Sequence, residues 1–139
     1  MWVLDPGNSR DLLDRLRTHG MPEEHDVIWC GEGWRSLIEQ CHAELERGFP
    51  AYWIDAIEQK AGVLAYQARP RLGEATDGEI ATLLAITARY EQLSASVCEW
   101  CGRPGRLRAE RAKLQTLCDE CLDDLATTPY PRASVARPH

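Results

Sequence analysis

Two pairs of cysteines constrain this chain more than any other feature of its sequence. Cys98 and Cys101 form one Cys-x-x-Cys pair, Cys118 and Cys121 form the second, and sixteen residues separate the two pairs. This spacing is typical of sites in which four thiolates surround one zinc ion, because two intervening residues let a tight turn aim both sulfurs at one point. The sequence therefore predicts a zinc centre with these four cysteines as its ligands.

The residues around the pairs indicate how the chain turns between them. Gly102 can adopt the positive φ that such a turn needs. Residues 107–117 can form a small hairpin, and residues 118–126 a helix whose first turn carries Asp119 and Glu120, as the helix dipole favours. Turn, hairpin and helix make a treble clef. Because four thiolates fill the coordination shell, we expect a structural and not a catalytic zinc ion.

Hydrophobic periodicity upstream of the cysteines predicts a helical body that carries one β-hairpin. Apolar residues at helical spacing predict three helices, over residues 9–19, 33–47 and 78–96. One broad side of the third helix is expected to face the core, and it is lined by Ile80, Leu83, Leu84, Thr87, Tyr90, Leu93 and Val97. Ser9 and Asp77 are the expected N-terminal caps of the first and the third of these helices.

The hairpin is predicted by two runs of aromatic and β-branched residues. They cover residues 51–58 and 63–68, and Gln59-Lys60-Ala61-Gly62 supplies the turn between them. A chain of 139 residues suits one modest core. We therefore predict an α+β fold with a helical body and hairpin in residues 1–97, a zinc module in residues 98–126 and a tail in residues 127–139.

The remaining two cysteines do not match a ligand pattern. Cys41 lies on the apolar face of a predicted helix, where a small hydrophobic residue is expected, and His42 follows it. Cys30 follows His25 by five residues. A second metal site built from these four residues is conceivable, but we expect the two thiols to be buried in the core.

The charge of the chain is unevenly distributed. The formal net charge is −6, and residues 1–97 carry nine basic and sixteen acidic side chains. The segment between the cysteine pairs instead carries five basic residues and one acidic residue. A negative whole-molecule field disfavours non-specific binding to nucleic acid. The basic segment is a candidate binding surface because its charge is opposite to that of the rest of the chain. With the tryptophan between two ligands, the candidate binding residues are Trp100, Arg103, Arg106, Arg108, Arg111 and Lys113.

This basic segment allows three interpretations. It can contact a protein partner, with Trp100 as an interface hot spot. It can contact phosphates while Trp100 stacks on a base. It can also pair with the protein's own carboxylates or offset the negative charge of the thiolate cluster. The sequence leaves these three open.

Enzyme motifs are missing from the sequence. It contains no phosphate-binding loop, dinucleotide fingerprint, nucleophile elbow or His-Glu-x-x-His motif. Nucleases built on a treble clef need a general-base histidine in the hairpin, and no histidine lies between residues 43 and 138. We therefore expect a protein that is not an enzyme.

The cysteine segments resemble the C-terminal part of a group of uncharacterised small bacterial and phage proteins. The resemblance rests on Cys98-Glu-Trp-Cys-Gly-Arg-Pro-Gly-Arg-Leu-Arg and on Thr116-Leu-Cys-Asp-Glu-Cys121. Upstream, Gly33-Trp34 with Leu37-Ile38 and the segment Ile57–Tyr66 also match, so it covers about residues 33–121. The resemblance implies the fold and the zinc site, and suggests a phage or mobile-element setting.

This chain differs from that group at two places. The last ligand there is often a histidine, whereas this chain has Cys121, which is an equally good ligand. The hairpin there commonly has a second glycine and an arginine, where this chain has Val63 and Ala65. Any function of that arginine is therefore not expected here.

These observations favour a non-enzymatic, zinc-stabilised adaptor or inhibitor that binds a protein. An acidic body can cover a basic surface on a partner and gain association rate from complementary charge. One alternative is a nucleic-acid-binding zinc-finger regulator that uses the basic hairpin 103–113. Another is a structural or assembly component, because alanines along helix 78–96 would allow close helix packing.

The expected location is the cytoplasm of a bacterial cell or a phage-infected host. No apolar run approaches the roughly 20 residues that a membrane span needs. The segment Met1–Pro6 has neither the basic nor the long apolar region of a secretory signal. A reducing cytoplasm favours metal binding over disulfides at the two cysteine pairs.

Overall fold

The computed structural model describes residues 4–21, 28–110 and 113–127. Within them the chain forms helices and two separate two-stranded antiparallel sheets, so the predicted α+β class is confirmed. The predicted tail lies outside the described residues except for Thr127. In chain order the elements are η1 (Pro6–Asn8), α1 (Arg10–Arg17), η2 (Glu32–Trp34), α2 (Arg35–Gly48), β1 (Trp53–Lys60), β2 (Val63–Arg69), α3 (Asp77–Ser94), β3 (Arg106–Arg108), β4 (Gln115–Leu117) and α4 (Asp119–Thr127).

The predicted hairpin is present as β1 and β2, joined by a tighter turn than the sequence suggested. Lys60 pairs directly with Val63, so only Ala61 and Gly62 form the turn. Both adopt positive φ, 50° and 86°, which matches a two-residue hairpin turn that follows the twist of the strands. The register shifts once, between Ile54 and Ala56, where the strand bulges.

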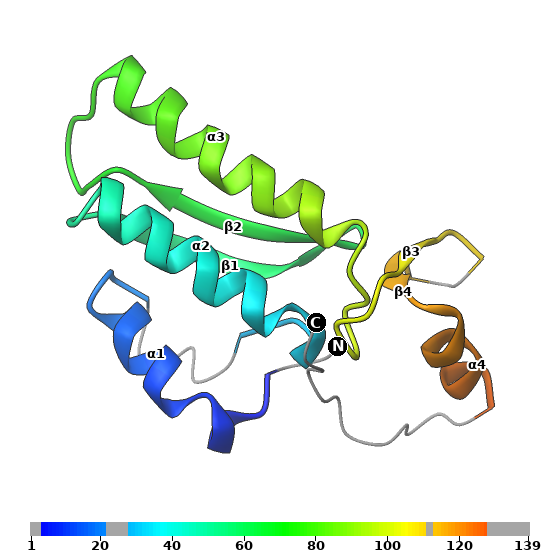
Figure 1. Cartoon of the computed structure of the whole chain (residues 1–139). Coiled ribbons are helices and arrows are strands. Elements are labelled where there is room, and N and C mark those ends of the chain that lie inside the picture. The colour runs from blue at the N-terminus through cyan, green and yellow to red at the C-terminus, as the bar shows by residue number, and fades with distance from the viewer. Residues whose placement is uncertain (1–3, 22–27, 111–112, 128–139) are drawn as a thin grey trace.

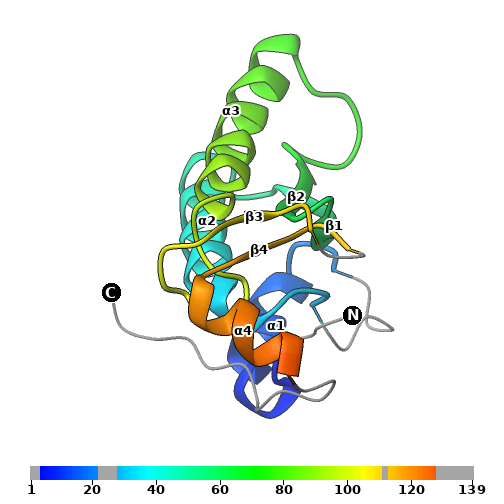
Figure 2. The ribbon, with the colours of Figure 1, turned by 90° about the vertical axis from the view of Figure 1, so that its right-hand side faces the viewer.

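The core lies between this hairpin and the helices on one of its faces. Helices α2 and α3 lie side by side there, and α1 packs next to α2 (Figures 1 and 2). The largest fully buried side chains come from all of these parts of the chain, and they include Leu12, Leu16, Trp34, Ile38, Leu45, Tyr52, Ile54, Leu64 and Leu83.

The cap of α3 differs from the prediction by one residue. Thr76, not Asp77, is the N-cap, since its hydroxyl accepts a hydrogen bond from the Glu79 N–H at 3.1 Å. The Glu79 carboxylate in turn accepts the Thr76 N–H at 3.0 Å, which completes a capping box. At α1, Ser9 occupies the cap position but makes no side-chain cap bond. Its hydroxyl donates to the Asp5 carbonyl at 2.6 Å.

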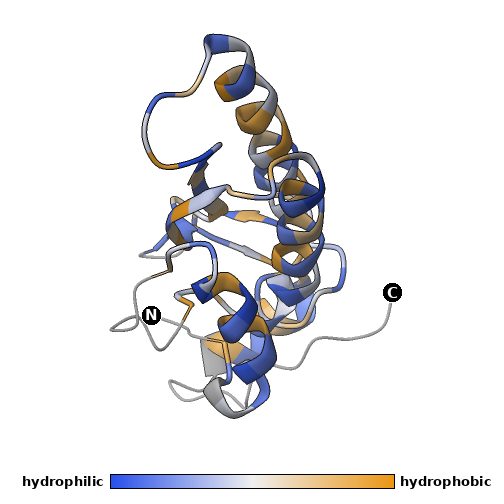
Figure 3. Cartoon of the chain, turned by 90° about the vertical axis from the view of Figure 1, so that its left-hand side faces the viewer, coloured by the Kyte–Doolittle hydropathy of each residue, from blue (hydrophilic) through white to orange (hydrophobic). Residues whose placement is uncertain are grey.

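The buried face of α3 is narrower than its sequence indicated. Leu83, Thr87, Tyr90 and Ser94 are buried. The other large apolar residues expected on this face are exposed by about two-fifths to one half, namely Ile80, Leu84 and Leu93. Figure 3 shows apolar and polar residues interspersed along this helix. Helix α3 thus presents apolar surface beyond the core.

No helix within the described residues is both long enough and apolar enough to cross a membrane.

Candidate metal centre

The two cysteine pairs lie together at the junction of α3, the β3–β4 hairpin and α4. Cys98 and Cys101 lie in the turn that follows α3. Cys118 directly precedes α4, and Cys121 lies in its first turn. All four Sγ atoms lie within 4.8 Å of one another, and Cys101 Sγ is 3.7 Å from Cys118 Sγ. The four predicted ligands therefore form one cluster.

This cluster has the dimensions of a tetrahedral thiolate site. With metal–sulfur bonds of about 2.3 Å, the sulfurs of a tetrahedral zinc site lie about 3.8 Å apart. Burial raises the pKa of the Cys98 thiol to about 11, and burial next to Cys98 also raises that of Cys121. A bound cation would replace these protons and neutralise the thiolates. The four cysteines can thus hold one metal ion.

Backbone hydrogen bonds shape the turn that carries the first pair. Gly102 has a φ of +81°, as predicted, and its N–H donates to the Cys98 carbonyl at 2.9 Å. The Cys98 N–H donates to the Arg103 carbonyl at 2.7 Å. At the second pair, the Cys121 N–H points at Cys118 Sγ at 3.4 Å. A backbone N–H that points at a sulfur, as that of Cys121 does, favours the negatively charged thiolate.

The metal centre is joined to the helical body through the segment before α2. The Gly33 N–H donates to the Glu99 carbonyl at 2.8 Å, and the Gly31 N–H donates to the Glu99 carboxylate at 3.0 Å. Glu99 is almost fully buried, and this burial raises its pKa to about 7. The Trp34 indole N–H donates to the Val97 carbonyl at 2.8 Å. These contacts explain why glycines and a tryptophan precede α2.

A second junction joins the β3–β4 hairpin to the β1–β2 turn. The Thr116 hydroxyl donates to the Gly62 carbonyl at 2.7 Å, and the Gln59 amide donates to the Leu114 carbonyl at 2.8 Å. A Cβ atom on Gly62 would lie 2.4 Å from the Leu107 side chain. The segment that carries the two cysteine pairs is therefore packed against the helical body at two places.

The structure separates the candidate binding residues into different groups. Arg108 is 2% exposed, and its guanidinium donates to the Leu117 carbonyl at 3.0 Å and to Asp119 at 2.7 Å. This guanidinium is therefore held by groups of the protein itself. Arg103 is exposed and donates to Glu120 at 2.8 Å. The contacts of Arg103 and Arg108 agree with the third interpretation, in which the arginines pair with the protein's own groups.

The other candidate binding residues lie at the surface or outside the described residues. Arg106 and Lys113 are exposed, and Trp100 is partly buried beside the cysteine cluster. Arg111 lies outside the described residues. Leu107 and Leu114 are 43% and 39% exposed on the same hairpin, so its surface is a mixture of apolar and basic side chains.

A groove that the sequence did not predict lies between β2 and α3. It has a volume of about 460 Å³, and its walls include Asp55, Tyr66, Ala68, Leu84, Thr87 and Glu91. Periodicity identified each element but not the gap between them, because the gap depends on how far α3 stands from the strand.

The proximity of two buried histidines, His19 and His42, was also not predicted from the sequence. His42 lies with His19 and Glu46, not with Cys30 or Cys41. Cys30 and Cys41 are buried in the apolar core, as expected, and burial raises the pKa of both thiols. His19 and Glu46 lie 27 residues apart, and no sequence spacing reveals such a pair.

No protein-family model, curated protein or solved structure matches this chain.

Proposed function

We propose that the protein is a non-enzymatic binding module, stabilised by a zinc ion in a treble-clef arrangement, that binds an extended segment of a partner protein. The four-cysteine cluster supports zinc through its ligand type and its sulfur spacing. The observation that carries the binding proposal is the groove between β2 and α3, because it is lined by residues of β2, whose outer edge pairs with no further strand among the described residues.

The hydrogen bonding of β2 shows which of its N–H groups face away from β1. The Leu64 N–H points away from β1 and donates to the Ser94 hydroxyl of α3 at 2.8 Å. N–H directions alternate along a strand, so the N–H groups of Tyr66 and Ala68 point to the same side. Both residues line the groove. A strand laid in the groove would meet these groups, which is the geometry of strand addition to a sheet edge.

The opposite edge of the hairpin is already occupied. The Gln59 N–H donates to the Trp29 carbonyl at 2.9 Å, and the Ile54 N–H donates to the His19 carbonyl at 2.8 Å. Segments of the chain itself thus pair with β1. An added strand is therefore expected at β2.

The side chains of the groove indicate what kind of segment it would accept. Leu84 is 52% exposed and offers apolar contact, and the acidic residues Asp55 and Glu91 are among the lining residues. The Asp55 carboxylate already accepts hydrogen bonds from Arg69, so Glu91 is the acidic residue that a basic side chain would meet. A segment that alternates apolar and basic residues would complement both features. The net charge of −6 favours the same kind of partner.

The β3–β4 hairpin gives less support to nucleic-acid binding than the sequence suggested. Arg108 is buried and Arg103 has a carboxylate partner. Arg106 and Lys113 are next to the exposed Leu107 and Leu114. A leucine side chain offers a phosphate neither a hydrogen bond nor a positive charge.

A pull-down from nuclease-treated lysate of the source cell tests the proposal. Wild type should retain a stoichiometric protein, Leu84→Glu should lose it, and Leu72→Glu should keep it. Leu72 is a matched control, since it is 58% exposed and does not line the groove. A synthetic peptide from the captured protein should then bind wild type and not Leu84→Glu.

Other results would support the alternatives. Loss of the partner in Arg106→Glu/Lys113→Glu, with retention in Leu84→Glu, would place the interface on the β3–β4 hairpin. If nothing is retained from the nuclease-treated lysate but nucleic acid co-purifies from untreated lysate, the zinc-finger regulator would be favoured. A dimer that Leu84→Glu converts to a monomer, seen by light scattering, would favour an assembly role in which two β2 edges pair.

A further inference from the structure

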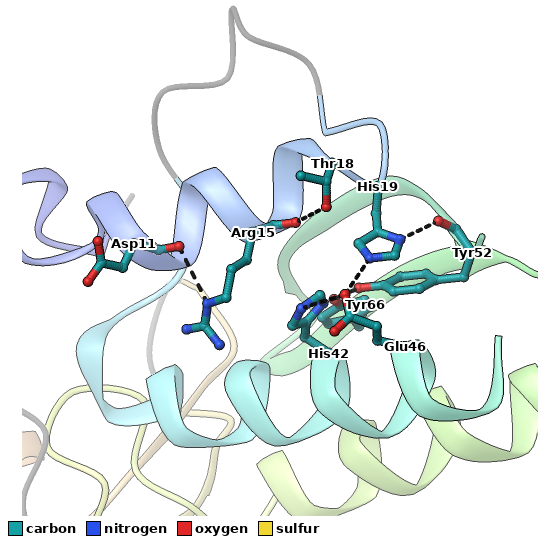
Figure 4. Close-up of polar contacts among 8 residues, drawn as sticks. All are labelled: Asp11, Arg15, Thr18, His19, His42, Glu46, Tyr52 and Tyr66. Atoms are coloured by element: carbon teal, nitrogen blue, oxygen red, sulfur yellow. Dashed lines mark hydrogen bonds and ion pairs between the residues drawn. The ribbon is translucent and has the colours of Figure 1, made fainter. Parts of the chain in front are cut away.

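We propose that His19, His42 and Glu46 form a second metal site, which takes a divalent transition-metal ion such as Zn²⁺ and is separate from the cysteine centre. The site lies where the end of α1 meets α2 and the start of β1 (Figure 4). His42 and Glu46 occupy one face of α2, four residues apart, and His19 faces them from the segment after α1.

The three ligand atoms have the spacing of a transition-metal site. His19 Nε2 is 2.8 Å from Glu46 Oε2, His42 Nε2 is 3.6 Å from the same oxygen, and all three atoms lie within 4.8 Å of one another. Zinc–nitrogen and zinc–oxygen bonds of about 2.0–2.1 Å place tetrahedral ligands about 3.4 Å apart. The two distances to Glu46 bracket this value.

The hydrogen bonds of His19 require a positive species between it and Glu46. Its Nδ1 lies 2.8 Å from the Tyr52 backbone carbonyl, which only accepts, so Nδ1 carries a proton. In a neutral ring Nε2 then holds a lone pair, and this lone pair faces a carboxylate oxygen at 2.8 Å. Two acceptors at this distance need either an extra proton or a cation between them. A metal ion meets this requirement and also engages His42 Nε2.

The outer contacts match those that orient histidine ligands. Metal-bound histidines usually donate their other N–H to a carbonyl, carboxylate or other oxygen, which fixes the ring. His19 Nδ1 meets the Tyr52 carbonyl, and His42 Nδ1 meets the Tyr52 hydroxyl at 2.7 Å. The Tyr52 hydroxyl lies 2.7 Å from that of Tyr66. With metal at both Nε2 atoms, His42 donates to Tyr52 and Tyr52 donates to Tyr66.

The burial of the three ligands differs in a way that suits metal entry. His19 and His42 are 5% and 2% exposed, and the His19 ring stacks on Tyr52 at 4.2 Å, so both imidazoles are held in place. The Glu46 side chain is 52% exposed and opens the cluster to solvent. Three protein ligands leave one position for water, in contrast to the closed four-cysteine shell.

Metal stoichiometry tests this inference. The full chain with its cysteine centre filled is titrated with Zn²⁺, followed by calorimetry and by metal analysis. Wild type should bind a second equivalent, whereas Glu46→Gln should bind none beyond the first. The glutamine amide can donate to His19 Nε2, so this variant is expected to keep the fold. Glu39→Gln, two turns earlier on α2, is the matched control and should bind two equivalents.

Nitrogen NMR supplies a second readout. Zn²⁺ should shift the Nε2 signals of two of the four histidines, and these shifts should disappear in Glu46→Gln. Binding of only one equivalent by wild type would overturn the inference and leave a proton-bridged His19–Glu46 pair. Retention of the second ion by folded Glu46→Gln would overturn it as well.

Discussion

Gly33 shows how a single atom can control the junction between the metal centre and the helical body. A Cβ atom at this position would lie 2.0 Å from the Cys98 carbonyl oxygen and 2.6 Å from the Gly102 nitrogen. Both are backbone atoms of the metal-binding turn, so no side-chain rotation relieves the clash. We predict that Gly33→Ala lowers the free energy of unfolding by about 3 kcal/mol, at the upper end of typical overpacking costs. Urea denaturation measures the effect.

Gly48 is the control for this prediction. It ends α2, and no described residue places an atom within 4 Å of a Cβ atom built on it, beyond its chain neighbours and its own helix. Alanine has the higher helix propensity, so Gly48→Ala should raise stability by up to about 1 kcal/mol. Equal effects of the two substitutions would contradict the close approach at Gly33.

Arg106 and Arg108 look equivalent in the sequence, but the structure gives them different roles. Arg108 is buried and donates to the carbonyl of Leu117, itself a buried residue. Removing its guanidinium leaves that carbonyl without this donor, so Arg108→Ala should cost about 2 kcal/mol. Arg106→Ala should change stability by less than about 0.5 kcal/mol, as exposed positions usually do. Thermal melts of the two variants compare them directly, and similar melting temperatures would contradict the assignment.

At the scale of elements, the N-cap of α3 is the residue before the one predicted from the sequence. The capping box uses Thr76 and Glu79, whereas periodicity alone favoured Asp77 as the cap. Thr76→Ala should therefore destabilise the protein by about 1 kcal/mol, the usual cost of losing a cap. Asp77→Ala should cost only a few tenths of that, through the helix dipole. The reverse order in urea denaturation would restore Asp77 as the cap.

The elements themselves were largely predictable, and their contacts were not. Apolar spacing located α1, α2, α3 and the β1–β2 hairpin within a few residues, because each buries one stripe or one face. It also assigned Ile80, Leu84 and Leu93 to the core, since nothing in a sequence says how wide a strip the neighbouring elements cover.

The candidate sites also differ in whether local sequence or tertiary contacts define them. The cysteine ligands lie in two short-range pairs, so their spacing revealed them. The histidine cluster joins residues from α2 and the segment after α1, and only the tertiary fold brings them together.

At the scale of the whole molecule, the stability of the helical body is expected to be coupled to that of the metal centre. Zinc-dependent modules of this size draw most of their folding free energy from the metal, about 10–16 kcal/mol of apparent binding free energy in small peptides. Here five hydrogen bonds that involve backbone atoms also join the centre to the segment before α2 and to the β1–β2 hairpin. Loss of the ion should therefore weaken the body as well as residues 98–127.

Cys118→Ser removes one of the four sulfur ligands of the cysteine centre. It should abolish tight zinc binding at the cysteine centre, unfold the C-terminal module and lower the Tm of the remainder. Because the Trp34 indole donates to the Val97 carbonyl, tryptophan fluorescence should change together with far-UV circular dichroism. Cys30→Ala, a core cysteine outside the cluster, should keep its zinc. The same comparison in a Glu46→Gln background separates the two sites, since a chelator then acts on the cysteine centre alone. Melting that is unchanged by chelation there would show that the fold does not depend on the ion.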